Sequence, residues 1–240
     1  MRRFYSPKEQ FSSDTVELDE GETRHLRDVL RLSMGDEAQI FDGEGREFLC
    51  RIESVEKKRT MLRIVKESAP TAPESRLHLT FAAAITKGEK FDLVVQKAVE
   101  LGVSRIVPLF TARCEVKPGG SDRRVERWSK IVLEASKQSG RARLMTIDRP
   151  MDFRKFAATE AGDHTTIMFS ERDGANFAEV RVTERITAII GPAGGWDDSE
   201  LEIARSNGFN IVTFGGRILR AETAAIAFAA VLQHRFGDLN

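Results

Sequence analysis

Two glycine-rich segments near the C-terminus carry the residues best suited to chemistry. Residues 191–196 and 215–224 each directly follow a short apolar run that is typical of a buried strand. Glycines at such positions let backbone N–H and C=O groups approach a ligand that larger side chains would exclude. In an open α/β sheet, ligands bind where loops leave the carboxyl ends of strands. The two segments therefore predict one shared binding pocket.

Other glycine and serine motifs are disfavoured by spacing and position. No GxxxxGK[ST] phosphate loop occurs, and a GxGxxG dinucleotide fingerprint should follow the first strand of a βαβ unit, whereas these two loops come last. No GxSxG elbow is present either, and Ser199 stands in an acidic run that we expect to cap the following helix. Nucleotide hydrolysis and acyl transfer are therefore disfavoured.

The first 70 residues are typical of a β-rich domain. Strands are predicted at 38–41, 47–52 and 60–65, with a turn at 42–45 that makes the first two a hairpin. One helix, 22–32, should interrupt them, with Leu26, Val29 and Leu30 on one face and Thr23 or the residues before it as a cap. Pro70 and Pro73 then break the pattern and predict a domain boundary.

Strands and helices alternate beyond that boundary. We expect strands at 77–85, 105–109, 165–169, 187–190 and 211–214, and helices at 89–101, 123–138, 198–207 and 221–236. This alternation favours an α/β domain with a mostly parallel sheet covered by helices on both faces. The chain of 240 residues is thus expected to form two domains, 1–72 and 73–240.

Composition excludes some classes and leaves others open. Lys plus Arg equal Asp plus Glu at 37 each, but residues 117–143 form a locally basic stretch that is either a phosphate contact or an ordinary solvated helix face. Cys50 and Cys114 are isolated and the four histidines are scattered, so we expect no disulfide framework and no metal. The sequence shows neither a secretory signal nor a bilayer-spanning run, which favours the cytoplasm and no membrane partner.

Several motifs together resemble one family. The segments Ile-Ile-Gly-Pro-x-Gly-Gly-aromatic at 189–196 and Phe-Gly-Gly-Arg-Ile-Leu-Arg-x-Glu-Thr-Ala at 214–224 are similar to those of the RsmE family, as are residues 24–31, 87–90, 96–103 and 134–141. Members of this family are S-adenosylmethionine-dependent 16S ribosomal RNA uridine N3-methyltransferases of the SPOUT class. Two departures stand out: Ala193 replaces the usual Glu, and Trp196 replaces the more usual Phe.

The resemblance implies a fold and partners. It predicts a PUA-like β-barrel that holds RNA in residues 1–72 and a SPOUT domain in 73–240 whose last segments form a trefoil knot. Family members bind S-adenosylmethionine in the knot and act as homodimers on ribosomal RNA. The alanine-rich final helix fits such an interface, although alanine's helix propensity explains that composition equally well.

The resemblance and the chemistry of methyl transfer together name the site residues. Uracil N3 must lose a proton as it attacks the methyl group, so a base or an anion-stabilising cation is needed. Arg220 is expected to stabilise an anion or phosphate and Glu222 to act as base or orienter, while Arg217 and Glu222 could instead form a structural salt bridge. The expected cofactor-binding residues are Phe169, Ile190, Gly191, Gly195, Phe214, Gly215, Ile218, Leu219, Thr223 and Ala224.

RNA contacts are expected from basic residues outside the pocket. The candidates are Arg2, Arg3, Arg24, Arg27, Arg31, Arg123, Arg124 and Arg141. For Arg24 and Arg31, ion pairs with Glu20, Glu22 or Asp28 are the alternative. Two other functions stay open: a SPOUT methyltransferase acting on another RNA or base atom, and a non-catalytic RNA-binding or ribosome-assembly protein.

Overall fold

The computed structural model describes residues 2–160, 162 and 164–239. Their contacts group into two units. The first unit comprises Met1–Glu74 with Leu133–Leu144, and the second comprises Ser75–Val132 with Met145–Asn240.

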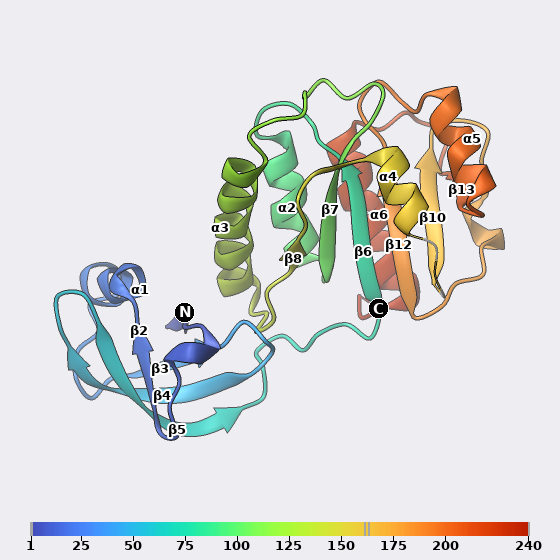
Figure 1. Cartoon of the computed structure of the whole chain (residues 1–240). Helices are drawn as coiled ribbons and strands as arrows, with labels where there is room; N and C mark the ends of the chain where they lie inside the picture. Colours follow the sequence, from blue (N-terminus) through green and yellow to red (C-terminus); the bar gives the residue numbers. More distant parts are fainter. Residues whose placement is uncertain (1, 161, 163, 240) are drawn as a thin grey trace. The chain divides into compact units, whose positions relative to one another are not determined.

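The first unit is built on a five-stranded sheet with the order β1-β3-β4-β5-β2, which is strongly curled in Figure 1. The strands are β1 (Arg3–Tyr5), β2 (Thr15–Leu18), β3 (Glu37–Phe41), β4 (Glu47–Val55) and β5 (Thr60–Ser68), and a short 3-10 helix, η1, spans Lys8–Gln10. β1 pairs with β3 in parallel and the other pairs are antiparallel. The predicted hairpin is confirmed as β3–β4.

Side chains of these strands, together with two leucines from the segment between β2 and β3, form a core of their own. Its members are buried apolar residues: Phe4, Val16, Leu18, Leu26, Leu32, Ala38, Ile40, Phe48, Cys50, Ile52 and Leu62. Burial raises the pKa of the Cys50 thiol to about 12, so this sulfur stays protonated and inert in the folded protein.

The helix of the first unit differs from its prediction. It begins as α1 (Glu20–Arg24), capped by the Asp19 carboxylate, which accepts from the Glu22 amide at 2.8 Å, and it ends in a π-helical turn, η2 (His25–Val29). The Leu30 amide donates to the His25 carbonyl five residues back, at 3.0 Å. This wider turn shifts the apolar face, so Leu26 is buried but Val29 is 65% exposed. Val29 therefore does not share the buried face of Leu26, and the prediction that the two lie on one face was wrong.

The second unit contains a parallel sheet with the order β11-β13-β10-β12-β6-β7-β8, and β9 also pairs with β7. Its strands are β6 (His78–Ala84), β7 (Arg105–Phe110), β8 (Thr146–Ile147), β9 (Met151–Asp152), β10 (Thr165–Ser170), β11 (Ala175–Asn176), β12 (Arg185–Ile190) and β13 (Asn210–Thr213). The predicted parallel sheet is confirmed. Because every described pairing is parallel, the strands end at one common edge.

Helices cover both faces of this sheet (Figure 1). They are α2 (Lys90–Glu100), α4 (Phe153–Thr159), α5 (Asp198–Ser206) and α6 (Ala221–Phe236), with a 3-10 turn, η3, at Phe177–Glu179. A further helix, α3 (Ser121–Ser139), begins in this unit, and its residues from Leu133 onward group with the first unit. α2 contacts α6 on one face, and α4 contacts α5 on the other. The predicted final helix, 221–236, has the observed bounds, whereas α4 was not predicted.

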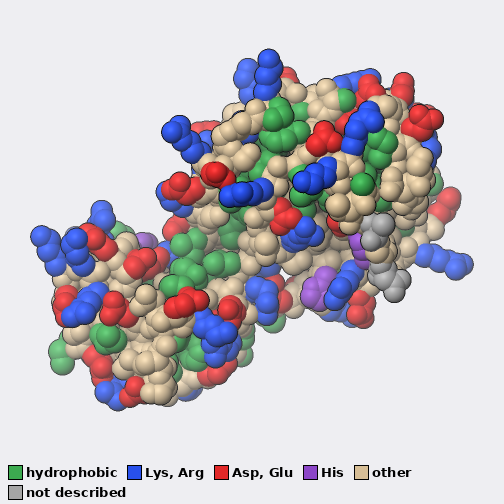
Figure 2. All heavy atoms as spheres, in the orientation of Figure 1, with side chains coloured by type: hydrophobic (Ala, Val, Ile, Leu, Met, Phe, Trp, Pro, Cys, Tyr) green, Lys and Arg blue, Asp and Glu red, His purple; other side chains and the backbone are tan. Residues whose placement is uncertain are grey.

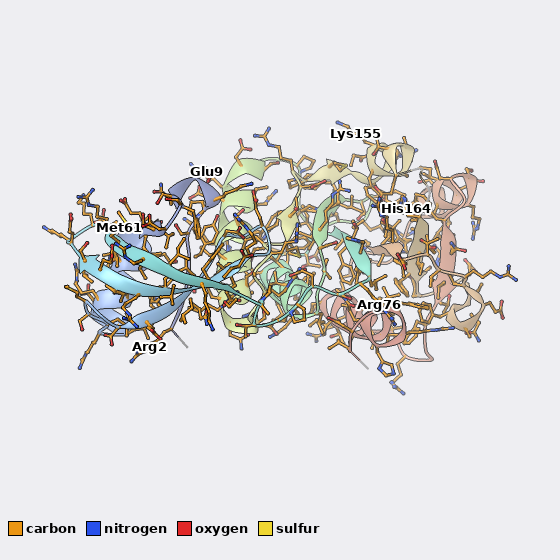
Figure 3. All side chains as sticks on the ribbon, turned by 90° about the horizontal axis from the view of Figure 1, so that it is seen from below. Arg2, Glu9, Met61, Arg76, Lys155 and His164 are labelled. Carbon is orange, nitrogen blue, oxygen red and sulfur yellow. The ribbon has the colours of Figure 1, made fainter. Side chains whose placement is uncertain are left out.

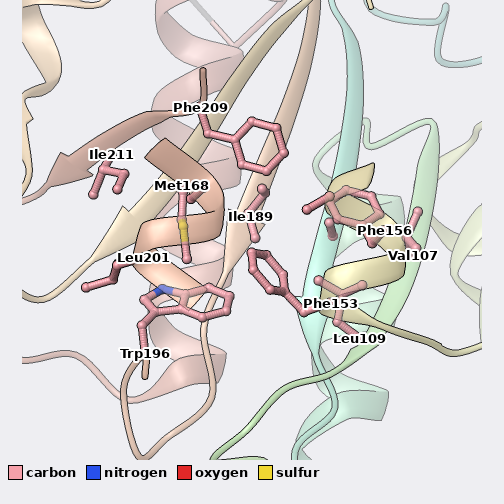
Figure 4. Close-up of a cluster of buried hydrophobic side chains, with 13 residues drawn as sticks. Val107, Leu109, Phe153, Phe156, Met168, Ile189, Trp196, Leu201, Phe209 and Ile211 are labelled. Carbon is pink, nitrogen blue, oxygen red and sulfur yellow. The ribbon is translucent and has the colours of Figure 1, made fainter. Parts of the chain in front are cut away.

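The core beneath α4 and α5 is shown in Figure 4. It joins Met168 of β10 and Ile189 of β12 to Phe153 and Phe156 of α4. The Trp196 ring belongs to the same cluster, with its centroid 5.2 Å from that of Phe153. The loop that carries Trp196 is thereby fixed to the core of the sheet.

Candidate functional site

A cavity of about 200 Å³ opens at the carboxyl ends of β10, β12 and β13. Its wall is formed by Phe169, Ser170, Glu171, Ile190, Gly191, Pro192, Trp196, Thr213, Phe214, Gly215, Gly216, Arg217, Ile218, Leu219, Ala221, Ala224 and Phe228. Both glycine-rich segments contribute to it. The prediction that they share one pocket is therefore confirmed.

Trp196 sets the shape of the first loop. Its indole Nε1 donates to the Phe169 carbonyl at 2.8 Å, and its side chain is 1% exposed. The ring occupies the space beside Gly191, where an added Cβ would lie 2.8 Å from indole atoms. A glycine is therefore required at 191, and the hydrogen bond joins the loop after β12 to the end of β10.

The same loop is also held from its C-terminal side. Asp197 caps α5, and Glu200 closes a capping box by accepting from the Asp197 amide at 3.1 Å. The pKa of Asp197 lies below its ordinary value, chiefly because the Ser199 hydroxyl and amide donate to it, with a further contribution from Arg113. Glu200 is 3% exposed and also accepts from the Ala112 amide at 2.8 Å. This carboxylate thus links the loop after β7 to the pocket loop.

The second loop is open toward the cavity. Gly215 has φ +77°, a conformation that favours glycine, and a Cβ at either Gly215 or Gly216 would meet no atom within 4 Å. Ile218 is 90% exposed, which is unusual for a large apolar side chain. Backbone and apolar groups of this loop are therefore accessible to a ligand.

Stacked aromatic rings form the floor beneath the loops. Phe228 of α6 lies parallel to Phe169 of β10, with centroids 3.7 Å apart, and edge-on to Phe214 at 5.4 Å. These rings connect α6 to the ends of β10 and β13. The floor is apolar, and such a surface suits a flat heteroaromatic ring.

The expected cofactor residues can be placed individually. Those that line the cavity are Phe169, Ile190, Gly191, Phe214, Gly215, Ile218, Leu219 and Ala224. Two expected residues are not among those that line the cavity: Gly195, in the first loop, and Thr223, in the first turn of α6.

The expected catalytic residues occupy one short stretch. Arg217 lies in the cavity wall, Arg220 is the exposed N-cap residue of α6, and Glu222 is half-buried in its first turn. Within the described chain, no ion pair joins Arg217 to Glu222.

Sequence reasoning missed several wall residues. Glu171, Thr213 and Phe228 stand out among them. Glu171 comes two residues after the predicted strand 165–169, and this position at the carboxyl end of a strand was the signal available for finding it. Phe228 lies two turns into α6, and only the packing of α6 on the sheet brings it to the pocket.

Most of the arginines expected to contact RNA are at the surface. Arg2, Arg24, Arg31 and Arg123 are exposed, and Arg2 lies at the periphery of its unit in Figure 3. Arg27 is half-buried and pairs with Asp28 at 2.6 Å, and half-buried Arg124 donates to the Gly119 carbonyl at 2.7 Å. On the face shown in Figure 2, basic and acidic side chains are interspersed rather than gathered in one patch.

Arg3 and Arg141 are placed differently from expectation. The Arg3 side chain is 1% exposed, lies 2.9 Å from Glu47, and donates to the Ser136 and Arg141 carbonyls at 2.9 Å. The Arg141 side chain is 5% exposed and pairs with Glu74 at 2.6 Å. Because both guanidinium groups are buried against carboxylates, we remove them from the set proposed to contact phosphates.

Comparisons with known proteins agree with this architecture. The sequence matches the RNA methyltransferase domain family over residues 73–233 and the RNA methyltransferase PUA domain family over residues 18–64. A relative from Synechocystis sp., named ribosomal RNA small subunit methyltransferase E, is 34% identical over 230 residues, which cover 93% of this chain and 74% of the relative. The chain belongs to the ribosomal RNA small subunit methyltransferase E family. The RsmE resemblance is confirmed, and so is the fold class of a PUA-like domain followed by a SPOUT domain, while the knot stays a prediction.

Two solved structures carry the cofactor. A ribosomal RNA small subunit methyltransferase E from Neisseria gonorrhoeae bound to S-adenosyl methionine is 35% identical, with a TM-score of 0.92 over 100% of both chains. A putative methyltransferase from Legionella pneumophila in complex with the same cofactor is 34% identical, with a TM-score of 0.90 over 99% of both chains.

The pocket of this RsmE-family chain fits that cofactor by its own chemistry. Phe228 and Leu219 offer apolar surface for an adenine ring, and the accessible backbone at Gly215 and Gly216 offers hydrogen-bonding groups. Glu171 adds a carboxylate that suits a cationic ligand.

Among the described helices, none combines the length and apolar character that a membrane span needs.

Proposed function

We propose that this protein is an S-adenosylmethionine-dependent methyltransferase that methylates N3 of a uridine in 16S ribosomal RNA. The observation that carries the proposal is the single cavity formed by residues 190–192 and 213–219 over an aromatic floor. It offers backbone and apolar surface for the donor, and Arg217 stands in the same wall.

The residues divide the work of the reaction. S-adenosylmethionine supplies the methyl group, and the loops hold it so that the acceptor nitrogen attacks in line. Arg220 stabilises the developing uracil anion or an adjacent phosphate, and Glu222 accepts or orients the N3 proton. Because N3 lies on the Watson–Crick edge, the target base must be unstacked before it enters the site.

The proposal also covers the roles of the two domains, the contacts with RNA, the oligomeric state and the cellular compartment. Residues 1–72 serve as the RNA-binding PUA-like domain and 73–240 as the methyltransferase domain, working in the cytoplasm. Arg2, Arg24, Arg27, Arg31, Arg123 and Arg124 are the proposed phosphate contacts. A homodimer forms through α6, whose apolar residues Ile226, Ala227, Ala230 and Val231 remain partly exposed in the single chain.

The test is nucleoside analysis after reaction with unmodified 16S RNA, supplied free or within small ribosomal subunits. We expect 3-methyluridine from the wild type and at least a hundredfold slower formation by Arg220→Ala, in line with the typical contribution of one stabilising group, about 10²–10³. A different methylated nucleoside would support a SPOUT enzyme with another target. RNA binding without any methylation would support a ribosome-assembly protein.

One observation weighs against the non-catalytic alternative. Ala193, the residue that replaces the family's usual Glu, is exposed and is not part of the cavity wall. The replacement therefore leaves the pocket described above complete.

A further inference from the structure

The cavity wall contains few charges. Among its described residues, only Glu171 and Arg217 have acidic or basic side chains. The Glu171 side chain is 35% exposed and lines the cavity, so its carboxylate is accessible to a ligand there.

Glu171 is held in place by its neighbours. Gly195 has φ +70°, and a Cβ at this position would lie 3.0 Å from Cδ of Glu171 and closer still to its Oε1. The absent side chain thus makes room for the carboxylate. On its other side, Arg172 Nε lies 3.6 Å from Oε1, and Arg172 is itself anchored by the Trp196 carbonyl at 3.0 Å and Asp198 at 2.7 Å.

Methyl transfer changes the charge of the donor. The sulfur–methyl bond breaks with its electron pair going to sulfur, the methyl group bonds to N3, and the N3 proton leaves to a base. The donor thereby changes from a sulfonium cation to the neutral thioether of S-adenosylhomocysteine, while its ammonium and carboxylate groups stay the same. A fixed anion in the wall attracts the cation and loses that attraction when the product forms.

We propose that Glu171 is a specificity residue that makes the pocket prefer the cationic methyl donor over its neutral product. This inference rests on the proposed function of the site. A carboxylate here both recruits the donor and favours release of the spent thioether. The alternative is that Glu171 forms a hydrogen bond to the ribose. Because donor and product share the ribose, Glu171 would then contribute equally to the affinity for both.

The experiment is calorimetric titration of the full chain with S-adenosylmethionine and, separately, with S-adenosylhomocysteine. For Glu171→Gln, we expect donor affinity to fall about tenfold and product affinity about twofold or less, so the preference shrinks about fivefold or more. Glu171→Asp, which keeps the charge, should retain most of the preference. Asp173→Asn is the matched control, since it removes a charge from the same loop but outside the wall, and it should change neither affinity.

The outcomes are distinct. Equal losses of both affinities in Glu171→Gln, or no loss of either, would overturn the inference while leaving the proposed function intact. Failure of the wild type to bind either compound would instead refute the proposed function. Circular dichroism of each variant excludes misfolding. If Glu171→Gln does not fold, Glu171→Ser, which also removes the charge, replaces it with the same expected and contradicting outcomes.

Discussion

Replacing Trp196 by Phe should destabilise the methyltransferase unit and weaken donor binding together. The indole is 1% exposed and donates its only N–H to the Phe169 carbonyl at 2.8 Å. Loss of a buried hydrogen bond costs about 1–2 kcal/mol. The smaller ring also gives up apolar area worth about 1 kcal/mol. We therefore expect the free energy of unfolding to fall by about 2–3 kcal/mol.

The assay combines urea unfolding, followed by circular dichroism, with calorimetric titration of S-adenosylmethionine. Trp196→Phe should also lower donor affinity, by about three- to tenfold, because the loop from Gly191 to Gly195 loses its anchor to β10. Trp128→Phe is the matched control: its indole is 3% exposed and donates to Asp92 at 3.1 Å, outside the pocket. This variant should lose stability but keep its affinity for the donor.

Two results would refute the reasoning. Unchanged stability of Trp196→Phe would mean that the indole hydrogen bond contributes nothing to folding. An equal loss of donor affinity in both tryptophan variants would mean that reduced affinity follows from general destabilisation rather than from the loop.

Three further predictions concern other buried groups. Glu200→Ala should lower the free energy of unfolding, measured by urea titration, by about 2 kcal/mol, because two backbone amides lose their acceptor. Glu200→Gln should lower it less. Equal stability of the wild type and both variants would contradict this prediction. Glu47→Ala leaves the buried Arg3 guanidinium without its carboxylate partner and should destabilise the first unit by about 3–5 kcal/mol. Backbone amides of the first unit should then exchange hydrogen faster, and unchanged exchange would contradict the prediction. With a thiol reagent at pH 8, half-buried Cys114 should react in the native protein. Cys50 should react only after unfolding, because burial raises the pKa of its thiol to about 12. Rapid labelling of Cys50 in the folded Cys114→Ser variant would show that Cys50 is not buried.

Local patterns were enough to predict much of the fold. The bounds of α6 and the main parallel strands follow from apolar runs and period changes, which depend on neighbouring residues alone. α4 was missed because only three of its seven residues, Phe153, Phe156 and Ala157, are buried, too few to establish a helical period. The π-helical turn of the first unit was missed because its hydrogen-bonding pattern leaves no mark in residue spacing.

The site was predictable only where the ligand-facing groups lie in one segment. The two glycine-rich loops could be recognised from their composition. Glu171 reaches the pocket through the pairing of β10 with its neighbouring strands, and Phe228 through the packing of α6. The burial of Arg3 and Arg141 was equally hidden, since their carboxylate partners lie 44 and 67 residues away along the chain. Contacts across such separations depend on tertiary structure.

Calorimetric titration of S-adenosylmethionine into the wild type and into Gly195→Val and Gly215→Val tests directly whether the two glycine-rich loops hold the donor. Valine at 195 would displace the Glu171 carboxylate, and valine at 215 would occupy the open cavity. Gly208→Val is the control, because Gly208 has a similar positive φ of 72° and open surroundings but is not part of the cavity wall.

If the loops hold the donor, the wild type and folded Gly208→Val bind it, whereas folded Gly195→Val and Gly215→Val do not. Absence of binding to the wild type, with RNA present and absent, would show that the two loops form no donor site.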